Sequence, residues 1–84
     1  MVSLKYIVYV LFSEVDGRRY IGSTNNLARR LSEHNSGKVK STRARYPLKV
    51  IYTEEFIDEG VARRRERFFK THKGYNELKR LIEV

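Results

Sequence analysis

Residues 6–34, with the sequence YIVYVLFSEVDGRRYIGSTNNLARRLSEH, decide the fold of this chain. The run at 6–12 is apolar or aromatic at every position, which is typical of a central strand covered on both faces. Asp16-Gly17 has the composition of a two-residue hairpin turn, and residues 18–22 then return as the partner strand. This part of the chain therefore predicts an antiparallel hairpin.

The hairpin turn also predicts which side chains share a face of the sheet. A two-residue turn at Asp16-Gly17 pairs Ser13 with Tyr20. Because side chains alternate along a strand, Tyr9 lies on the same face as Ser13. Tyr9 and Tyr20 therefore point to one side of the sheet, although either ring taken alone is more often an ordinary core or edge aromatic.

An amphipathic helix is predicted after the hairpin, with Ser23 or Thr24 as its N-cap. Leu27 and Leu31, four residues apart, point inward from this helix. Arg30 and His34 flank this leucine stripe.

Arg30 and His34 have the same four-residue spacing and lie at the boundary between the apolar stripe and solvent. A cation such as Arg29, opposite the leucines, is typical of a plain solvated face. The boundary is where clefts form, so we expect Arg30 and His34 in a cleft. For His34 the plainer alternative is a cation that interacts with the dipole at the end of the helix.

Three short segments resemble the motifs of the GIY-YIG nuclease family, in particular its small stand-alone members. They are Ile7-Val8-Tyr9, Tyr20-Ile21-Gly22 and Arg30 in the following helix. Ile7 replaces the glycine of the family's name, and this change affects local packing more than chemistry. The resemblance covers nearly the whole chain, and residues 1–84 are expected to form one domain.

The second half of the chain predicts one more strand and two more helices. Residues 48–56 form the third strand, and Asp58 caps a helix at 61–72. Gly74 ends that helix, and residues 75–82 form a short third one. The predicted inward-facing residues are Val61, Ala62, Phe68 and Phe69 in the second helix and Leu78, Leu81 and Ile82 in the third. The expected fold is α+β, a three-stranded antiparallel sheet flanked by about three helices.

Glu66 is a carboxylate at the edge of the apolar stripe of the second helix. It lies four residues after Ala62 and three before Phe69, so it is close to the buried face. The plain interpretation is ion pairing with neighbouring cations such as Lys70. The resemblance instead implies that Glu66 is the family's metal-binding glutamate.

The excess of positive charge points to a polyanionic partner. Lys and Arg number 18 against 10 Asp and Glu, giving a net charge of +8. Such an excess favours DNA or RNA through counterion release. The residues expected to contact the nucleic-acid backbone are Lys38, Lys40, Arg43, Arg45, Arg63 and Lys70. The alternative for the basic segment 38–46 is a solvated connector.

The resemblance implies a metal-dependent DNA endonuclease with a single Mg²⁺ or Mn²⁺. By this resemblance, Tyr9 would be the general base, and Tyr20 would orient the water or the phosphate. Arg30 would bind the scissile phosphate, and His34 would assist Tyr9 or bind a phosphate. Glu66 would hold the metal. One clear carboxylate argues against a two-metal site. Ser23 stands where some members have a lysine, and Lys70 is a weak candidate to replace it.

Two other functions stay open from the sequence: a non-catalytic nucleic-acid-binding module of the same fold, and a ribosome- or RNA-associated binder. A nuclease of this size is expected to have low sequence specificity, to be a monomer or weak dimer, and to serve DNA repair. With no cysteine, signal peptide or apolar span in the sequence, we expect a cytoplasmic protein without a membrane partner.

Overall fold

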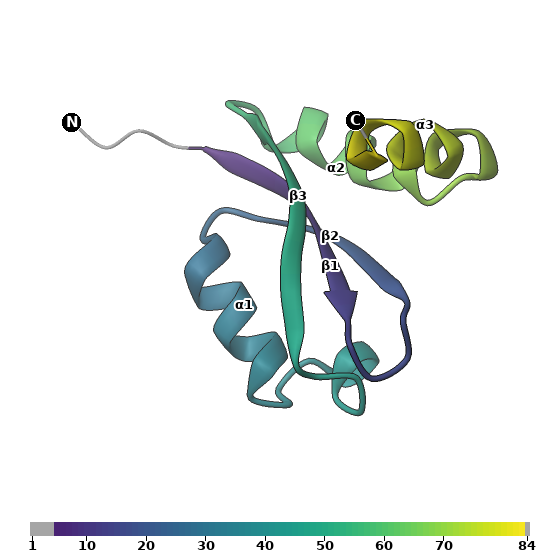
Figure 1. Cartoon of the computed structure of the whole chain (residues 1–84). Coiled ribbons are helices and arrows are strands. Elements are labelled where there is room, and N and C mark those ends of the chain that lie inside the picture. The colour runs from purple at the N-terminus through teal and green to yellow at the C-terminus, as the bar shows by residue number, and fades with distance from the viewer. Residues whose placement is uncertain (1–4, 84) are drawn as a thin grey trace.

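The computed structural model describes residues 5–83, and these form one sheet and three α-helices. The strands are β1 (Tyr6–Ser13), β2 (Arg19–Thr24) and β3 (Leu48–Phe56). They are antiparallel in the order β2-β1-β3, so the apolar run at 6–12 is the central strand, as predicted (Figure 1). The expected α+β fold is confirmed.

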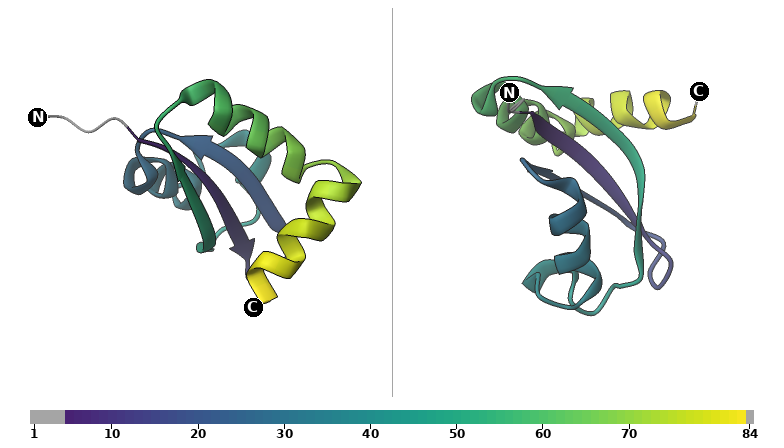
Figure 2. Two further views of the ribbon diagram at one scale, coloured as in Figure 1. Left: turned by 90° about the horizontal axis from the view of Figure 1, so that it is seen from above. Right: turned by 90° about the vertical axis from the view of Figure 1, so that its left-hand side faces the viewer.

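The helices cover both faces of the sheet. Helix α1 (Leu27–Asn35) lies on one face, and α2 (Glu59–Phe69) and α3 (His72–Glu83) lie on the other (Figure 2). Two separate clusters of buried side chains result, because successive residues of β1 point to opposite faces. One comprises Val8, Val10, Ile21, Ala62, Phe69 and Leu78. The other comprises Tyr9, Leu11 and Leu48, with Tyr20, Leu27 and Leu31 packed against them.

The hairpin register differs from the prediction by two residues. Tyr20 pairs with Leu11, not with Ser13, and the connection is longer than a two-residue turn. The Ser13 hydroxyl accepts hydrogen bonds from the backbone N–H groups of Val15 and Asp16, at 3.2 and 3.3 Å, which stabilises the longer loop. A shift of two residues preserves the alternation of side chains, so Tyr9 and Tyr20 still share a face.

The cap of α1 is Asn26, and the prediction of Ser23 or Thr24 was wrong. The Asn26 side chain accepts a hydrogen bond of 3.0 Å from the backbone N–H of Arg29. The Ser23 hydroxyl is instead directed to Glu66, and Thr24 precedes the cap in an extended segment.

The junction between α2 and α3 also corrects the prediction. Asp58 caps α2 as expected, but the helix ends at Phe69, before His72. Gly74 does not break a helix; it lies inside α3, packed so closely on α2 that a Cβ atom there would overlap the Phe68 carbonyl group. The glycine therefore permits a close helix–helix approach.

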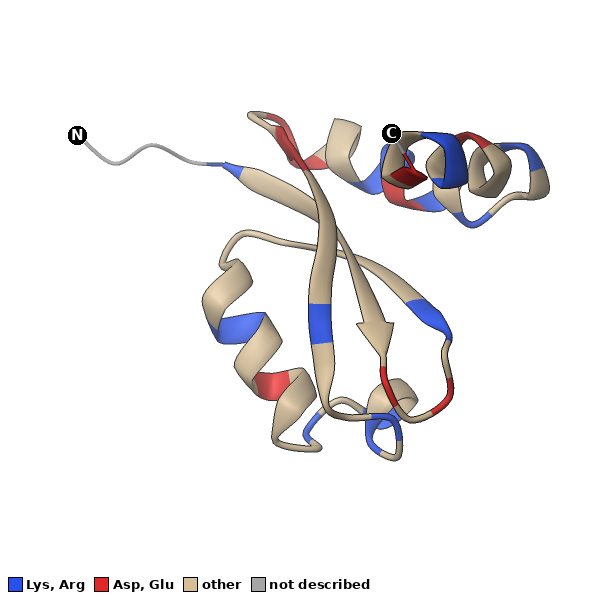
Figure 3. Ribbon diagram, in the orientation of Figure 1, with Lys and Arg blue, Asp and Glu red and all other residues tan. Residues whose placement is uncertain are grey.

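Two residues that were predicted to point inward lie partly at the surface. Val61 and Leu81 are each 37% exposed, whereas Phe69 and Leu78 are buried. Within residues 5–83, none of the helices combines the length and the apolar character that crossing a membrane would require. Lysine and arginine are spread over all three helices, β2, β3 and the loop before β3 (Figure 3).

Candidate active site

Tyr9, Tyr20 and His34 form an aromatic cluster between the sheet and α1. Their ring centroids are 6.3 Å apart for the two tyrosines and 4.8 Å apart for Tyr20 and His34. Tyr9 pairs with Gly22 across the ladder, and a Cβ atom on Gly22 would lie 2.5 Å from the Tyr9 hydroxyl. The glycine of the Tyr20-Ile21-Gly22 segment thus leaves the space that the Tyr9 ring occupies.

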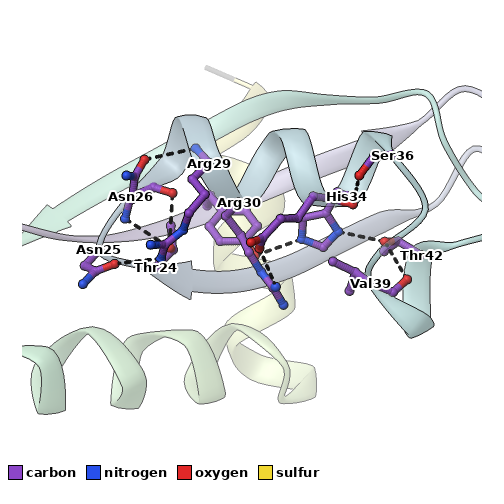
Figure 4. A network of polar contacts seen from close by, with 11 residues as sticks. Thr24, Asn25, Asn26, Arg29, Arg30, His34, Ser36, Val39 and Thr42 are labelled. Carbon is purple, nitrogen blue, oxygen red and sulfur yellow. Dashed lines mark hydrogen bonds and ion pairs between the residues drawn. The ribbon is translucent and has the colours of Figure 1, made fainter.

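His34 links Tyr9 to the loop after α1 through both ring nitrogens. Nε2 lies 3.1 Å from the Tyr9 hydroxyl, and Nδ1 lies 2.8 Å from the hydroxyl of Thr42 (Figure 4). The Thr42 hydroxyl also lies 3.5 Å from the Val39 carbonyl oxygen, to which it can only donate. With the Thr42 hydroxyl proton directed at the Val39 oxygen, Nδ1–H of His34 donates to the Thr42 oxygen, and Nε2 accepts the hydrogen bond from the Tyr9 phenol.

Burial shifts the pKa values of Tyr9 and His34 in the directions that favour their neutral forms. It raises the pKa of the Tyr9 phenol to about 12, although the Arg30 guanidinium partly opposes this shift. It lowers the pKa of His34, and the positive charge of Arg30 acts in the same direction. His34 is therefore a neutral imidazole at pH 7 and can accept a proton.

Arg30 extends from α1 beside this cluster (Figure 4). Its guanidinium donates to the Glu33 carboxylate at 3.0 Å, and its side chain is 35% exposed. The pKa of Arg30 is raised, first by Glu33 and then by Tyr9. Arg30 therefore lies at the boundary between core and solvent as expected, with a fixed positive charge near both phenols.

Glu66 projects from α2 toward the end of β2. One carboxylate oxygen accepts a hydrogen bond of 2.6 Å from Ser23, and the other pairs with Lys70 at 2.7 Å. Partial burial alone would raise the pKa of Glu66, but Lys70 and Ser23 outweigh it and hold the pKa below its usual value. Glu66 and Ser23 line a cavity of about 360 Å³ together with Arg63 and Arg67.

The expected site residues come from two faces of the sheet and approach one another at the β2 edge. Tyr9 and Tyr20 face α1, whereas Glu66 belongs to a helix on the other face. Glu66 is nevertheless close enough for its negative charge to contribute to the raised pKa of Tyr9. The Glu66 cavity is not lined by Tyr9 or Arg30, so the aromatic cluster and Glu66 lie on opposite sides of the edge strand β2 and do not share that cavity.

The six expected backbone-binding cations differ in their surroundings. Arg45 is held by Asp16 at 2.7 Å, Arg63 pairs with Glu59 at 3.1 Å, and Lys70 pairs with Glu66. The others are Lys38, Lys40 and Arg43, which are exposed and have no ion pair within residues 5–83. Arg45 therefore has a structural role in addition to any contact with a partner.

Sequence reasoning missed Thr42 and Glu33 as residues that position the site. Thr42 is buried in a short 3-10 turn and holds His34, but it lies in a segment without a periodic pattern. Glu33 holds Arg30, and its three-residue spacing from Arg30 was a signal that could have been used.

The residues around Glu66 can hold a divalent metal only weakly, through a single carboxylate. Within the described part of the chain, no three acidic, histidine or cysteine side chains gather as a ready ligand set. A Mg²⁺-type site can use one carboxylate, with water and substrate phosphate completing the shell. Glu66 is ionised and borders an open cavity, so it meets this minimal requirement once the half-exposed Lys70 side chain moves aside.

Known proteins resemble this chain over most of its length. Residues 5–79 match the model of the GIY-YIG catalytic domain. A UPF0213 protein of Streptococcus agalactiae is 44% identical, covering 83% of this chain and 80% of its own length. A UPF0213 protein of Lactiplantibacillus plantarum is 45% identical, with 92% and 78% covered.

A solved structure shares the fold. The solution NMR structure of a UPF0213 protein from Bacillus halodurans has a TM-score of 0.58 and 33% identity, covering 93% of this chain and 85% of its own. The matched domain model implies nuclease-type chemistry on nucleic acid. The sequence motifs, the fold and these relatives lead to one conclusion: this chain belongs to the GIY-YIG family.

Proposed function

We propose that the protein is a divalent-metal-dependent endonuclease that hydrolyses phosphodiester bonds in DNA with low sequence specificity. The observation that supports this most is the hydrogen-bonded series Tyr9, His34 and Thr42 beside Arg30. A structural core does not require a neutral histidine aimed at a phenol, with a guanidinium next to both. General-base catalysis does require such a proton acceptor.

In this proposal the proton moves from the phenol to the imidazole. The Tyr9 hydroxyl gives its proton to Nε2 of His34, and the phenolate then accepts a proton from the attacking water. The water oxygen forms the new bond to phosphorus as the bond to the leaving oxygen breaks. The leaving oxygen takes a proton from solvent water and becomes a hydroxyl, and His34 afterwards releases its proton to solvent. Because the pKa of Tyr9 is about 12, the phenol needs both His34 and the Arg30 charge to act near neutral pH.

Arg30 and Glu66 would stabilise the charge that develops on the phosphate. The guanidinium offers several donors in a planar fork, which suits phosphate oxygens. Glu66 would hold a Mg²⁺ or Mn²⁺, and this metal would supply Lewis-acid stabilisation of the leaving oxygen. Tyr20 would orient the water or the phosphate from the neighbouring strand.

Two observations favour a second candidate, a nucleic-acid-binding module without catalysis. Tyr9 is only 1% exposed, and Glu66 is already neutralised by Lys70. In a binding module, Tyr9 and His34 would be a satisfied polar pair in the core. In this alternative no metal is needed, and nucleic-acid binding persists when Glu66 is replaced.

A cleavage assay separates the two functions. Plasmid, single-stranded and branched DNA, with RNA for comparison, would be incubated with the protein in Mg²⁺, Mn²⁺ or EDTA. We expect metal-dependent cleavage of DNA that Glu66→Ala abolishes while DNA binding stays intact or tightens slightly, since a repulsion against phosphate is also removed. Cleavage by Glu66→Ala at the parent rate would contradict the proposal.

A further inference from the structure

A basic cavity lies on the α3 side of the sheet, apart from the aromatic cluster and from Glu66. The end of α3 lies beside the end of β1 and the start of β2 (Figure 2). The cavity between them has a volume of about 560 Å³, and we call it the hairpin–α3 cavity. Its lining consists of Phe12, Gly17, Arg18, Arg19, Tyr75 and Lys79, without any acidic residue.

The cations of this cavity are not neutralised by ion pairs. Arg30 and Arg63, in contrast, each have a carboxylate partner. Within residues 5–83, no ion pair joins Arg18, Arg19 or Lys79 to a carboxylate. Three unpaired cations around one concave surface create a positive potential that attracts phosphate groups.

An exposed aromatic ring lies among these cations. Tyr75 is 40% exposed, and the Arg19 guanidinium lies over its ring at 5.9 Å from the centroid. Lys79 follows one helical turn later, so it shares the Tyr75 face of α3. An exposed ring with an arginine over it and further cations in the same cavity is a combination that suits unpaired nucleotides.

We propose that the hairpin–α3 cavity binds a single-stranded segment of the nucleic-acid substrate, with phosphates at Arg18, Arg19 and Lys79 and one base stacked on Tyr75. The ring selects single strands because the faces of bases in a duplex are already stacked on one another. The proposal takes nucleic acid as the ligand from the proposed function and narrows the substrate to DNA with an unpaired segment.

The position of the cavity suits a strand that continues to the candidate active site. Arg19 and Ser23 lie on the same face of β2, four residues or about 13 Å apart along the strand. Ser23 is hydrogen-bonded to Glu66. A strand bound at Tyr75 can therefore run along the β2 edge to Glu66.

Binding measured in EDTA tests this proposal without any cleavage. Fluorescence anisotropy would give the affinity for an oligothymidine of about 15 nucleotides, near the upper range for one binding module, and for a duplex of the same length. The variants are Tyr75→Leu, Tyr75→Trp and Lys79→Gln. Ile57→Ala is the control, because Ile57 is also an exposed apolar side chain, at 86%, but lies between β3 and α2 and outside the hairpin–α3 cavity.

We expect Tyr75→Leu to weaken single-strand binding about tenfold or more and duplex binding much less. Tyr75→Trp retains the ring and should bind at least as well as the parent, which separates stacking from a folding defect. Lys79→Gln should reduce the slope of log affinity against log salt by about 0.7 for a single strand. Ile57→Ala should match the parent.

Three results would overturn the proposal. They are equal losses for single strand and duplex in Tyr75→Leu, an equal loss in Ile57→Ala, or binding of polyglutamate as tight as that of oligothymidine. The last result would identify the cavity as a site for acidic polypeptides. The binding measurements are made in EDTA and do not depend on cleavage. A protein that binds single strands through Tyr75 but cleaves no DNA in Mg²⁺ or Mn²⁺ would refute the proposed nuclease and leave this inference standing.

Discussion

The hydrogen bond between Tyr9 and His34 joins the central strand β1 to helix α1, which covers one face of the sheet. Both side chains are almost completely buried, and each neutral form is favoured over its charged form. Arg30 acts on both groups with opposite consequences: its positive charge favours a Tyr9 phenolate and disfavours a protonated His34. The same burial makes stability depend on pH.

We predict that the free energy of unfolding decreases as the pH falls below about 6.5. The pKa of His34 is lower in the folded state, so the unfolded chain binds more protons between that pKa and about 6.5, and stability is lost as the pH falls through this range. The carboxylates with lowered pKa values respond only below about 4.5; they are Asp16, Glu33, Glu54 and Glu66.

Denaturant unfolding from pH 5 to 8 would check this dependence. His72→Gln should keep the slope, because His72 is exposed, whereas His34→Gln should remove it. If His34→Gln does not fold, the ring protons of His34 can be followed by NMR in the parent protein. A His34 that titrates at or above the ordinary value would contradict the prediction.

The ion pair between Lys70 and Glu66 predicts an effect on metal affinity. The Lys70 ammonium competes for the carboxylate oxygen that a divalent ion would use, so Lys70→Met should bind Mn²⁺ more tightly than the parent. An exposed pair of this kind accounts for about a two- to fivefold change. Calorimetry or electron paramagnetic resonance with Mn²⁺ alone would measure it.

Glu66→Gln is the control for this experiment and should lose the Mn²⁺ site. Equal Mn²⁺ affinities for Lys70→Met and the parent would show that Lys70 does not compete with the metal. Equal affinities for Glu66→Gln and the parent would place the metal elsewhere.

At the scale of the elements, the close contact between α2 and α3 depends on Gly74. Gly74→Ala should destabilise the protein by about 2 kcal/mol or more, because the new methyl group meets the rigid Phe68 backbone. Gly60→Ala is the matched control in α2, where the methyl group lies 3.1 Å from the Asp58 side chain. It should change stability by less than about 1 kcal/mol. Thermal unfolding of both variants tests this, and equal melting temperatures would contradict the close contact.

The strands could be predicted well from the sequence, whereas caps and turns could not. β3 matches residues 48–56 because its apolar pattern is bounded on both sides. The cap of α1 was missed because Ser23, Thr24 and Asn26 are all capping residue types, and only tertiary contacts decide among them. The Gly74 error has the same cause, since a glycine that ends a helix and one that permits close packing look alike in sequence.

The candidate site could be predicted only in part. Alternation along the strands placed Tyr9 and Tyr20 together in spite of the wrong register. The contact of His34 with Thr42 depends on how the loop after α1 turns back, and no periodic pattern reports this. The split of the site across β2 also depends on which face each helix covers, and that is a property of the whole fold.

At the scale of the whole molecule, the net charge of +8 predicts salt-sensitive binding to nucleic acid. Affinity should fall steeply between about 50 and 200 mM salt, since each cation that contacts a phosphate releases a counterion. Replacing Lys38 and Lys40 by glutamine should reduce the salt slope by about one per contact. Equilibrium binding at several salt concentrations measures this, and binding that does not change with salt would contradict phosphate contacts as its main source.

The central claim is that Tyr9 is the base of a metal-dependent nuclease, and single-turnover cleavage by Tyr9→Phe tests it most directly. Phenylalanine keeps the ring and its packing against Tyr20 and removes only the hydroxyl, so the variant should fold, with a cost of about 1–3 kcal/mol for the unpaired His34 nitrogen. We predict that it binds DNA like the parent and cleaves it at least about 10²-fold more slowly in Mg²⁺ or Mn²⁺. Cleavage by a folded Tyr9→Phe variant at the parent rate would contradict the account.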